Sequence, residues 1–142
     1  MRIAQLRTTL AQFLPRLVRR LRGRPRVWVD ADVLKGRLDD DEQLSVIDVR
    51  GPEEFTGPLG HIPNSRNVPL GEFPDRIEEL RPLGKRPIVV VCKTDKRSAN
   101  AAKLLRETGF RDVAVLRGGL EHWNELGFDT SGVSAKSEQQ SQ

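Results

Sequence analysis

Cysteine is nearly absent from this chain of 142 residues, which contains one, Cys92, together with only two histidines. A single cysteine excludes an internal disulfide and leaves no second thiol within the chain to react with the first. One cysteine and two histidines also cannot supply the four ligands of the usual zinc site. We therefore expect no metal, and a protein that works in a reducing compartment, the cytoplasm.

Long apolar runs are missing as well. No segment approaches the run of about 20 apolar residues that spans a bilayer. The chain has no internal repeat, and 37% of its residues are hydrophobic and 31% charged. This composition indicates one ordinary globular domain that is large enough to bury a core.

Acidic residues are missing from residues 1–26, which contain eight arginines. The rest of the chain carries 16 basic and 20 acidic residues, or −4, so the net charge of +4 comes from this N-terminal arm. Apolar residues recur through the arm at helical spacing, as Ile3, Leu6, Leu10, Phe13, Leu17 and Leu21. The pattern predicts a basic amphipathic helical arm, kinked or restarted at Pro15.

Three surfaces could receive the arm. Its apolar stripe could pack on its own domain, or the arm could bind a protein partner or lie on an anionic membrane surface, which would make the protein peripheral there. We expect no nucleic acid as partner, because almost no aromatic residues are interleaved with the arginines.

The most informative stretch is residues 87–109. Ile88 to Val91 form a short β-branched run that predicts a buried central strand. Ser98 to Thr108 are rich in alanine and leucine, which predicts a helix with Gly109 at its C-cap.

Cys92 lies between this strand and this helix, where backbone N–H groups and the positive end of the helix dipole point to one place. These groups, with Lys93, Lys96 and Arg97, would favour the thiolate and hold an incoming anion beside it. The alternative is that Cys92 is a small, inert core residue. The three cations and the strand-to-helix position favour the reactive thiol.

The remaining elements alternate in type along the chain. Strands are expected at residues 27–29, 44–49 and 113–116, and helices at residues 30–38, 71–80 and 119–126. Residues 39–42 and 56–69 are expected to be loops, and residues 129–142 a disordered tail. Such alternation predicts a three-layer α/β fold with a mainly parallel central sheet flanked by helices.

Four ordered motifs carry a resemblance to a known family. Residues 46–61 read VIDVRGPEEFTGPLGH and continue as IPNSRNVPL, residues 92–98 read CKTDKRS, and residues 116–123 read LRGGLEHW. They resemble the Asp-Val-Arg, Glu-Phe and Gly-His-Ile-Pro signature, the active-site loop and the Arg-Gly-Gly-Leu-x-x-Trp signature of the single-domain rhodanese-like sulfurtransferases. The resemblance covers about residues 27–128, and one family position that is often glycine is Asn64 here, which tolerates a left-handed backbone.

The resemblance implies a rhodanese-like domain over residues 27–128 that transfers sulfur through a persulfide on Cys92. A small anionic donor such as thiosulfate would load the cysteine, and an external thiol, a protein cysteine or cyanide would unload it, without any cofactor. The substrate-binding loop would be Lys93, Thr94, Asp95, Lys96, Arg97 and Ser98. Structural support would come from Asp48, Arg50, Glu54 and His61.

Some of these residues have alternative roles. His61 could serve as a general base for Cys92, and Asp48 and Glu54 as an acid and base, but sulfur exchange at a thiolate requires no such groups. Phosphatases and arsenate reductases of related fold resemble one another in a Cys-x5-Arg loop, whereas this loop is Cys-x4-Arg.

Asp95 occupies a loop position where many active members of the family have glycine. Its carboxylate would subtract charge from the site and repel a dianion, so we expect slow turnover with thiosulfate. The alternative function is a non-catalytic or sulfur-relay binding module that the N-terminal arm directs to a surface or a partner.

Overall fold

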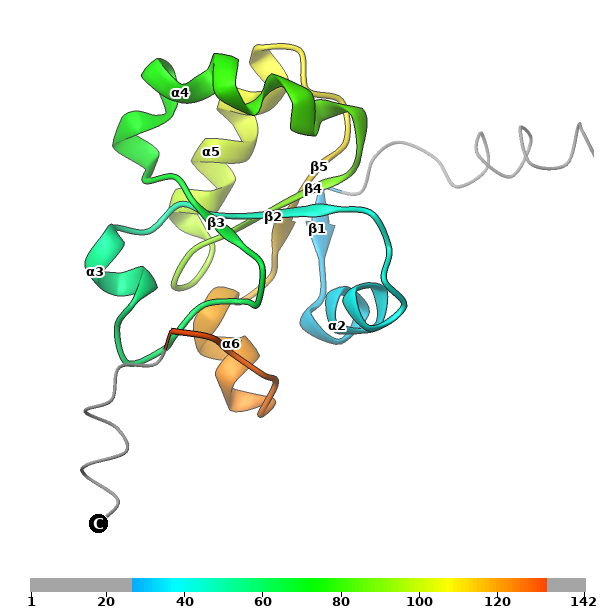
Figure 1. Ribbon diagram of the computed structural model, residues 1–142, viewed down its shortest axis with the longest axis vertical. Helices are drawn as coiled ribbons and strands as arrows, with labels where there is room; N and C mark the ends of the chain where they lie inside the picture. Colours follow the sequence, from blue (N-terminus) through cyan, green and yellow to red (C-terminus); the bar gives the residue numbers. More distant parts are fainter. Residues whose placement is uncertain (1–26, 133–142) are drawn as a thin grey trace, which may run out of the picture.

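The computed structural model describes residues 27–132 (Figure 1). The arm predicted for residues 1–26 and most of the predicted tail, from residue 133 onward, lie outside the described residues, so both stay predictions. No helix within residues 27–132 has the length and apolar character that crossing a membrane requires.

Five parallel strands form the central sheet, in the order β1-β5-β4-β2-β3. The strands are β1 (Trp28–Val29), β2 (Ser45–Asp48), β3 (Arg66–Asn67), β4 (Ile88–Val91) and β5 (Val113–Leu116). All four residues of β4 are buried, and β4 lies in the middle of the sheet. The prediction of a buried central strand over residues 88–91 is therefore confirmed.

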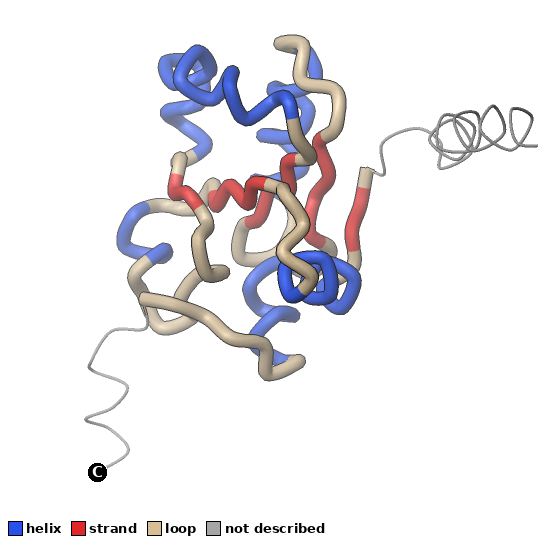
Figure 2. Tube along the Cα trace, turned by 45° about the vertical axis from the view of Figure 1, so that its right-hand side comes forward, coloured by secondary structure: helices blue, strands red, loops and turns tan. Residues whose placement is uncertain are grey.

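Helices cover both faces of the sheet, as Figures 1 and 2 show. Helices α4 (Phe73–Leu80) and α5 (Lys96–Glu107) lie on one face, and α2 (Ala31–Asp39) and α6 (Gly119–Glu125) on the other. The short helix α3 (Pro52–Phe55) follows β2, and 3₁₀ turns η1 (Leu70–Glu72) and η2 (Arg81–Lys85) flank α4. The predicted three-layer α/β fold is confirmed.

Alternation along the strands divides the core in two. One set of strand residues packs with α4 and α5, and it includes Ile47, Val90 and Val115. The neighbouring residues pack with α2 and α6, and they include Val46, Val89 and Ala114. Cys92 continues the first set, so its side chain belongs to the face that α5 covers.

The predicted element boundaries were close, and two short elements without an apolar pattern were missed. The helix after Cys92 begins at Lys96 rather than Ser98, and its C-cap is Thr108, with Gly109 following at a φ of 101°. Helix α3 and strand β3 were not predicted, because they lack the apolar pattern that identifies the equally short strands β1, β2, β4 and β5.

Residues 129–132, which the composition assigned to a disordered tail, are placed by the structure. Ser131 forms an isolated antiparallel bridge with His61, and Trp123 donates its indole N–H to the carbonyl oxygen of Asp129 at 3.0 Å. These contacts hold the segment against the domain, so the ordered part of the chain continues four residues beyond the predicted boundary.

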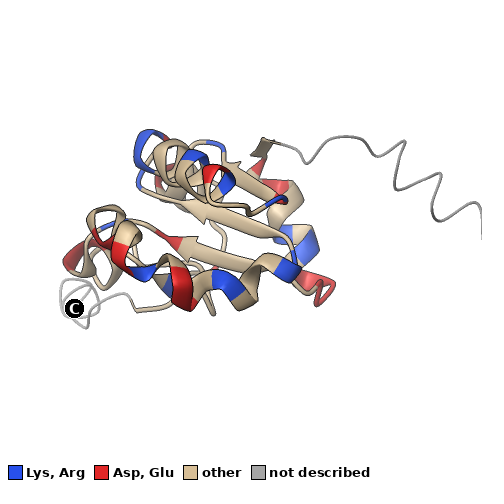
Figure 3. Ribbon diagram, turned by 90° about the horizontal axis from the view of Figure 1, so that it is seen from above, with Lys and Arg blue, Asp and Glu red and all other residues tan. Residues whose placement is uncertain are grey.

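Charges of both signs are distributed over the helices of the two outer layers (Figure 3). Several are paired locally, such as Arg76 with Glu79 within α4 and Arg117 with Asp30 at 2.9 Å. Asp30 is the N-cap residue of α2, but its side chain binds Arg117 rather than capping the helix.

The core between the sheet and α5 can be tested with one large-to-small substitution. Leu105→Ala removes a fully buried side chain, and we expect a loss of about 2–5 kcal/mol in the free energy of unfolding. Leu126→Ala is the control, because Leu126 is 45% exposed, and its effect should stay within about 0.5 kcal/mol. Urea denaturation measures both, and equal losses in the two variants would contradict this assignment of the core.

Candidate active site

Cys92 directly follows the central strand, and four residues separate it from Arg97 in the first turn of α5. Cys92 is 1% exposed, and its sulfur lies 3.2 Å from the hydroxyl oxygen of Ser98. The Ser98 hydroxyl also lies 3.1 Å from the carbonyl oxygen of Asp95, to which it donates. A hydroxyl can donate to only one acceptor at a time, so Ser98 accepts from the thiol and can turn its hydrogen toward a thiolate.

The backbone of the loop supplies further donors. Within residues 27–132, the amides of Lys93, Thr94 and Asp95 donate to no protein acceptor. The first amides of α5 also lack partners inside the helix, as at any helix N-terminus. Asp95 has a φ of −152°, which lies outside the left-handed region that favours glycine. The loop therefore presents free N–H groups close to a thiol, an arrangement that favours an anion.

Two of the three cations predicted to bind an anion already have carboxylate partners. Both terminal nitrogens of Arg97 donate to the carboxylate oxygens of Glu54, at 2.6 and 2.9 Å. Lys93 lies 3.5 Å from Glu121. Lys96 is exposed and forms no ion pair with any residue that the structure describes. Arg97 and Lys93 must each leave its partner before it can bind a substrate, so their predicted role in binding stays a prediction.

The pairing also shows in the ionisation of these side chains. The hydrogen bonds to Arg97 hold the pKa of Glu54 below its ordinary value, against the opposing effect of its burial. In return, Glu54 raises the pKa of Arg97. The positive charges at the loop are those of Lys93, Lys96 and Arg97. Asp95, Glu54 and Glu121 supply the same number of negative charges. A dianion near Cys92 would gain little net Coulomb attraction from such a set.

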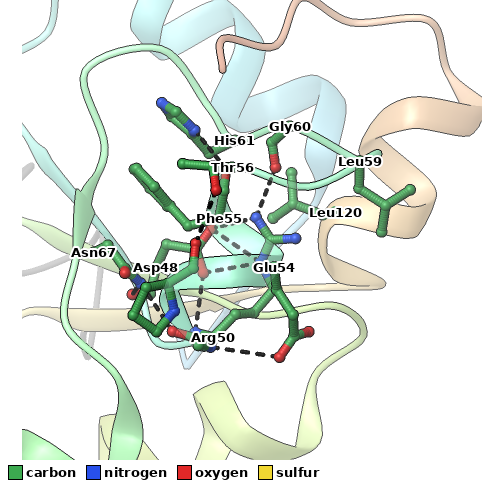
Figure 4. A network of polar contacts seen from close by, with 12 residues as sticks. Asp48, Arg50, Glu54, Phe55, Thr56, Leu59, Gly60, His61, Asn67 and Leu120 are labelled. Atoms are coloured by element: carbon green, nitrogen blue, oxygen red, sulfur yellow. Dashed lines mark hydrogen bonds and ion pairs between the residues drawn. The ribbon is translucent and has the colours of Figure 1, made fainter. Parts of the chain in front are cut away.

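A second charged network lies beside the first at the end of β2 (Figure 4). Arg50 donates to both carboxylate oxygens of Asp48, the shortest distance being 2.8 Å, and to the carbonyl oxygen of Gly60 at 2.7 Å. Asn67 of β3 donates to the carbonyl oxygen of Arg50 at 2.8 Å. Asp48 and Arg50 are fully buried, so this network ties the strand end to the loop that follows α3, which supports the predicted structural role.

His61 lies in this loop and faces Phe55. Its ring stacks on that of Phe55 with centroids 3.6 Å apart, and its Nδ1 lies 2.8 Å from the carbonyl oxygen of Phe55, to which it donates. Among residues 27–132 no hydrogen bond joins His61 to Cys92. This geometry supports a structural role for His61 over that of a general base. Asn64, in the same loop, has the left-handed φ of 65° that its family position suggested.

A pocket of about 420 Å³ adjoins the Cys92 loop, lined by Arg50, Glu54, Pro58, Leu59, Lys93 and Glu121. Sequence reasoning missed Glu121, which brings its carboxylate to Lys93 from the first turn of α6. The signal available was its position, directly after the Arg-Gly-Gly-Leu motif. No cluster of side chains within residues 27–132 could hold a metal ion.

The fold and the loop define a class of protein, a three-layer α/β domain with a cysteine between its central strand and the amino end of a helix. The family model of the rhodanese-like domain matches residues 30–126. The chain therefore belongs to the rhodanese-like domain family, as its motifs predicted.

Individual relatives agree with this assignment. The protein YqhL of Bacillus subtilis (strain 168) is 40% identical over 81 residues, and the match covers 57% of this chain and 61% of YqhL, less than two thirds of that relative. A sulfurtransferase of Allochromatium vinosum is 32% identical over 99 residues, covering 70% of this chain and 89% of that protein. The solution structure of the rhodanese-like domain of Alr3790 from Anabaena has a TM-score of 0.67 and 33% identity, covering 75% of this chain and 80% of that one.

The ion pair between Glu54 and Arg97 predicts a pH dependence of stability. Because the folded pKa of Glu54 lies below 4.5, its ordinary value, the pair stabilises the fold above about pH 4.5 and stops doing so as the pH falls through the folded pKa. Both side chains are 39% exposed, so the contribution should stay below about 1 kcal/mol. Glu54→Gln should therefore destabilise the protein at neutral pH and differ less from the unmodified protein at pH 3.

Urea denaturation at several pH values measures this difference. Glu53→Gln is the matched control, because Glu53 is exposed and forms no ion pair with any residue in the described range 27–132. A difference for Glu54→Gln that stays constant from pH 7 to pH 3 would show that the ion pair does not contribute.

Proposed function

We propose that this chain transfers sulfane sulfur from a small anionic donor of the thiosulfate type to an external thiol or to cyanide, through a persulfide on Cys92. The observation that carries the proposal is the contact of the Cys92 sulfur with the Ser98 hydroxyl in a loop whose amides at Lys93, Thr94 and Asp95 have no acceptor among the described residues. These donors favour both a thiolate and a persulfide anion over the neutral forms.

The reaction has two displacement steps. The Cys92 thiolate attacks the outer sulfur of thiosulfate, the sulfur–sulfur bond of the donor breaks, and sulfite leaves with the bonding electrons. An acceptor nucleophile then attacks the outer sulfur of the Cys92 persulfide, and Cys92 leaves as the thiolate. The acceptor is external, because the chain contains no second cysteine. In a cell it would be a thiol or a protein cysteine, and no cofactor takes part in either step.

The loop side chains have separate roles in this proposal. Ser98 can turn its hydroxyl hydrogen from the Asp95 carbonyl to the Cys92 thiolate, and Lys96 is the exposed cation that can meet an anionic donor without leaving a partner among the described residues. Lys93 and Arg97 contribute only after they separate from Glu121 and Glu54. Thr94 and Asp95 contribute through their backbone amides, and the Asp95 carboxylate opposes a dianion.

Intact-mass measurement tests the persulfide. After incubation with thiosulfate, the unmodified protein should gain one sulfur, about 32 Da, and cyanide should remove it. Cys92→Ser should gain nothing and serves as the control. If the unmodified protein gains no sulfur while its cysteine can still be alkylated, thiosulfate is excluded as a donor and the proposal fails in this form.

The charge of Asp95 can be tested separately. Asp95→Ala removes a negative charge beside the thiol, and we expect the rate with thiosulfate to rise about fivefold, the effect of about 1 kcal/mol. Asp112→Ala changes the net charge equally at the opposite end of the strands, before β5, and should leave the rate unchanged. A folded Asp95→Ala variant with an equal or lower rate would show that this carboxylate does not limit the reaction.

The second candidate is a sulfur-relay or binding module of the same family, directed to a surface or partner by residues 1–26. The balanced charges around the loop and the burial of Cys92 favour it over a fast thiosulfate enzyme. A protein persulfide that loads Cys92 when thiosulfate does not would support this alternative. Phosphatase chemistry is less well supported, because the loop is one residue shorter than Cys-x5-Arg and Arg97 is paired with Glu54.

A further inference from the structure

The amino end of α6 binds the backbone of the Cys92 loop. The amide of Leu120 donates to the carbonyl oxygen of Cys92 at 2.9 Å, and the amide of Glu121 donates to that of Lys93 at 3.1 Å. In this way the first turn of α6, whose amides have no partner within the helix, receives acceptors from the loop.

Gly119 allows this close approach. It has a φ of 60°, and a Cβ atom built on it would overlap three consecutive carbonyl oxygens, those of Cys92, Lys93 and Thr94. Three backbone oxygens of the loop therefore lie against the Cα of one residue. A residue with a side chain at this position would push the loop away from α6, because backbone atoms cannot step aside as the end of a flexible side chain can.

The direction of these carbonyls determines the direction of the amides. In a trans peptide the carbonyl of one residue and the amide of the next point to opposite sides. When the carbonyls of Cys92, Lys93 and Thr94 point to α6, the amides of Lys93, Thr94 and Asp95 point away from α6. These are the three loop amides that have no acceptor among the described residues.

We propose that Gly119 is a positioning residue for the reacting sulfur. By drawing three carbonyls to α6, it turns the loop amides away from α6, toward the face of the sheet on which the Cys92 side chain lies, where they stabilise the thiolate and the persulfide. The inference rests on the proposed function only in taking Cys92 as the reacting group. It can be tested without any sulfur donor, so its failure and the failure of the proposed function are distinguishable.

A matched control is available in the same region of the chain. Gly127 has a φ of 73°, similar to that of Gly119, but a Cβ atom built on it meets no atom within 4 Å. Alanine at either position is destabilised by the left-handed backbone conformation. Only alanine at position 119 also displaces the loop, so a comparison of the two variants isolates the contact with the carbonyls.

The readout is the titration of the thiolate by its ultraviolet absorbance. The chain contains one cysteine and no tyrosine, so the absorbance gained as the pH rises reports on Cys92. We expect the titration midpoint of Gly119→Ala to lie about one pH unit higher than that of the unmodified protein, which is about tenfold less thiolate at lower pH. Gly127→Ala should titrate as the unmodified protein does. Equal midpoints for a folded Gly119→Ala and Gly127→Ala would overturn the proposal.

A second pair of variants covers the case in which Gly119→Ala does not fold, as judged by circular dichroism. Glu121→Pro removes the amide that binds the Lys93 carbonyl, at a position in the first turn of α6 where proline is tolerated. Glu121→Ala removes the same side chain and keeps the amide. A higher midpoint for Glu121→Pro than for Glu121→Ala supports the proposal, and equal midpoints overturn it.

Discussion

Two opposite charges, Asp48 and Arg50, are buried at the end of β2, and one side of the site depends on their remaining paired. Removing charged groups from water is costly, and only complete pairing and hydrogen bonding offset the cost. Arg50 meets this condition through Asp48 and the Gly60 carbonyl, and Asn67 binds the backbone beside it. Strand β2, the loop after α3 and strand β3 are thereby held together. Arg50 itself and two residues of that loop, Pro58 and Leu59, line the pocket beside the Cys92 loop.

Charged side chains at the surface of the site are paired as well, and this pairing affects which substrates the site can select. Glu54 and Glu121 come from two different elements, and each neutralises a cation that the loop contributes. In the proposed sulfur transfer, attraction of an anionic donor then depends on backbone amides and Lys96 rather than on a concentration of positive side chains. Backbone amides are short-range donors, so such a site distinguishes substrates by their fit to the loop more than by their total charge.

Local signals in the sequence were enough to predict most of the fold. Local patterns predict β4, α5 and α4. These patterns are a β-branched run in β4, a stretch rich in alanine in α5, and the helical spacing of Phe73, Ile77 and Leu80 in α4. The position of Cys92 followed from the same signals. Helix α3 and strand β3 are fixed instead by tertiary contacts, such as the pairing of β3 with β2, and have no comparable pattern.

The pairing state of the site was beyond prediction for a related reason. Arg97 and Glu54 are 43 residues apart in the sequence, and nothing in the spacing indicates that they meet. Sequence reasoning therefore counted Lys93, Lys96 and Arg97 as free cations and did not consider Glu121. Likewise, the bridge between Ser131 and His61 orders residues that composition alone describes as tail. The partner of a charged or polar side chain is determined by the three-dimensional fold, whereas apolar periodicity can be recognised in the sequence itself.

The contact between the Cys92 loop and α6 also determines when the site can form during synthesis. The loop carbonyls are bound by residues 119–121, which leave the ribosome well after Cys92 does. A nascent chain that ends before α6 already contains all five strands, but it lacks the groups that bind the loop carbonyls, so its site is incomplete. The loop around the sulfur obtains these hydrogen bonds only when α6, the last helix of the domain, has docked. Completion of the fold and completion of the site are therefore the same event.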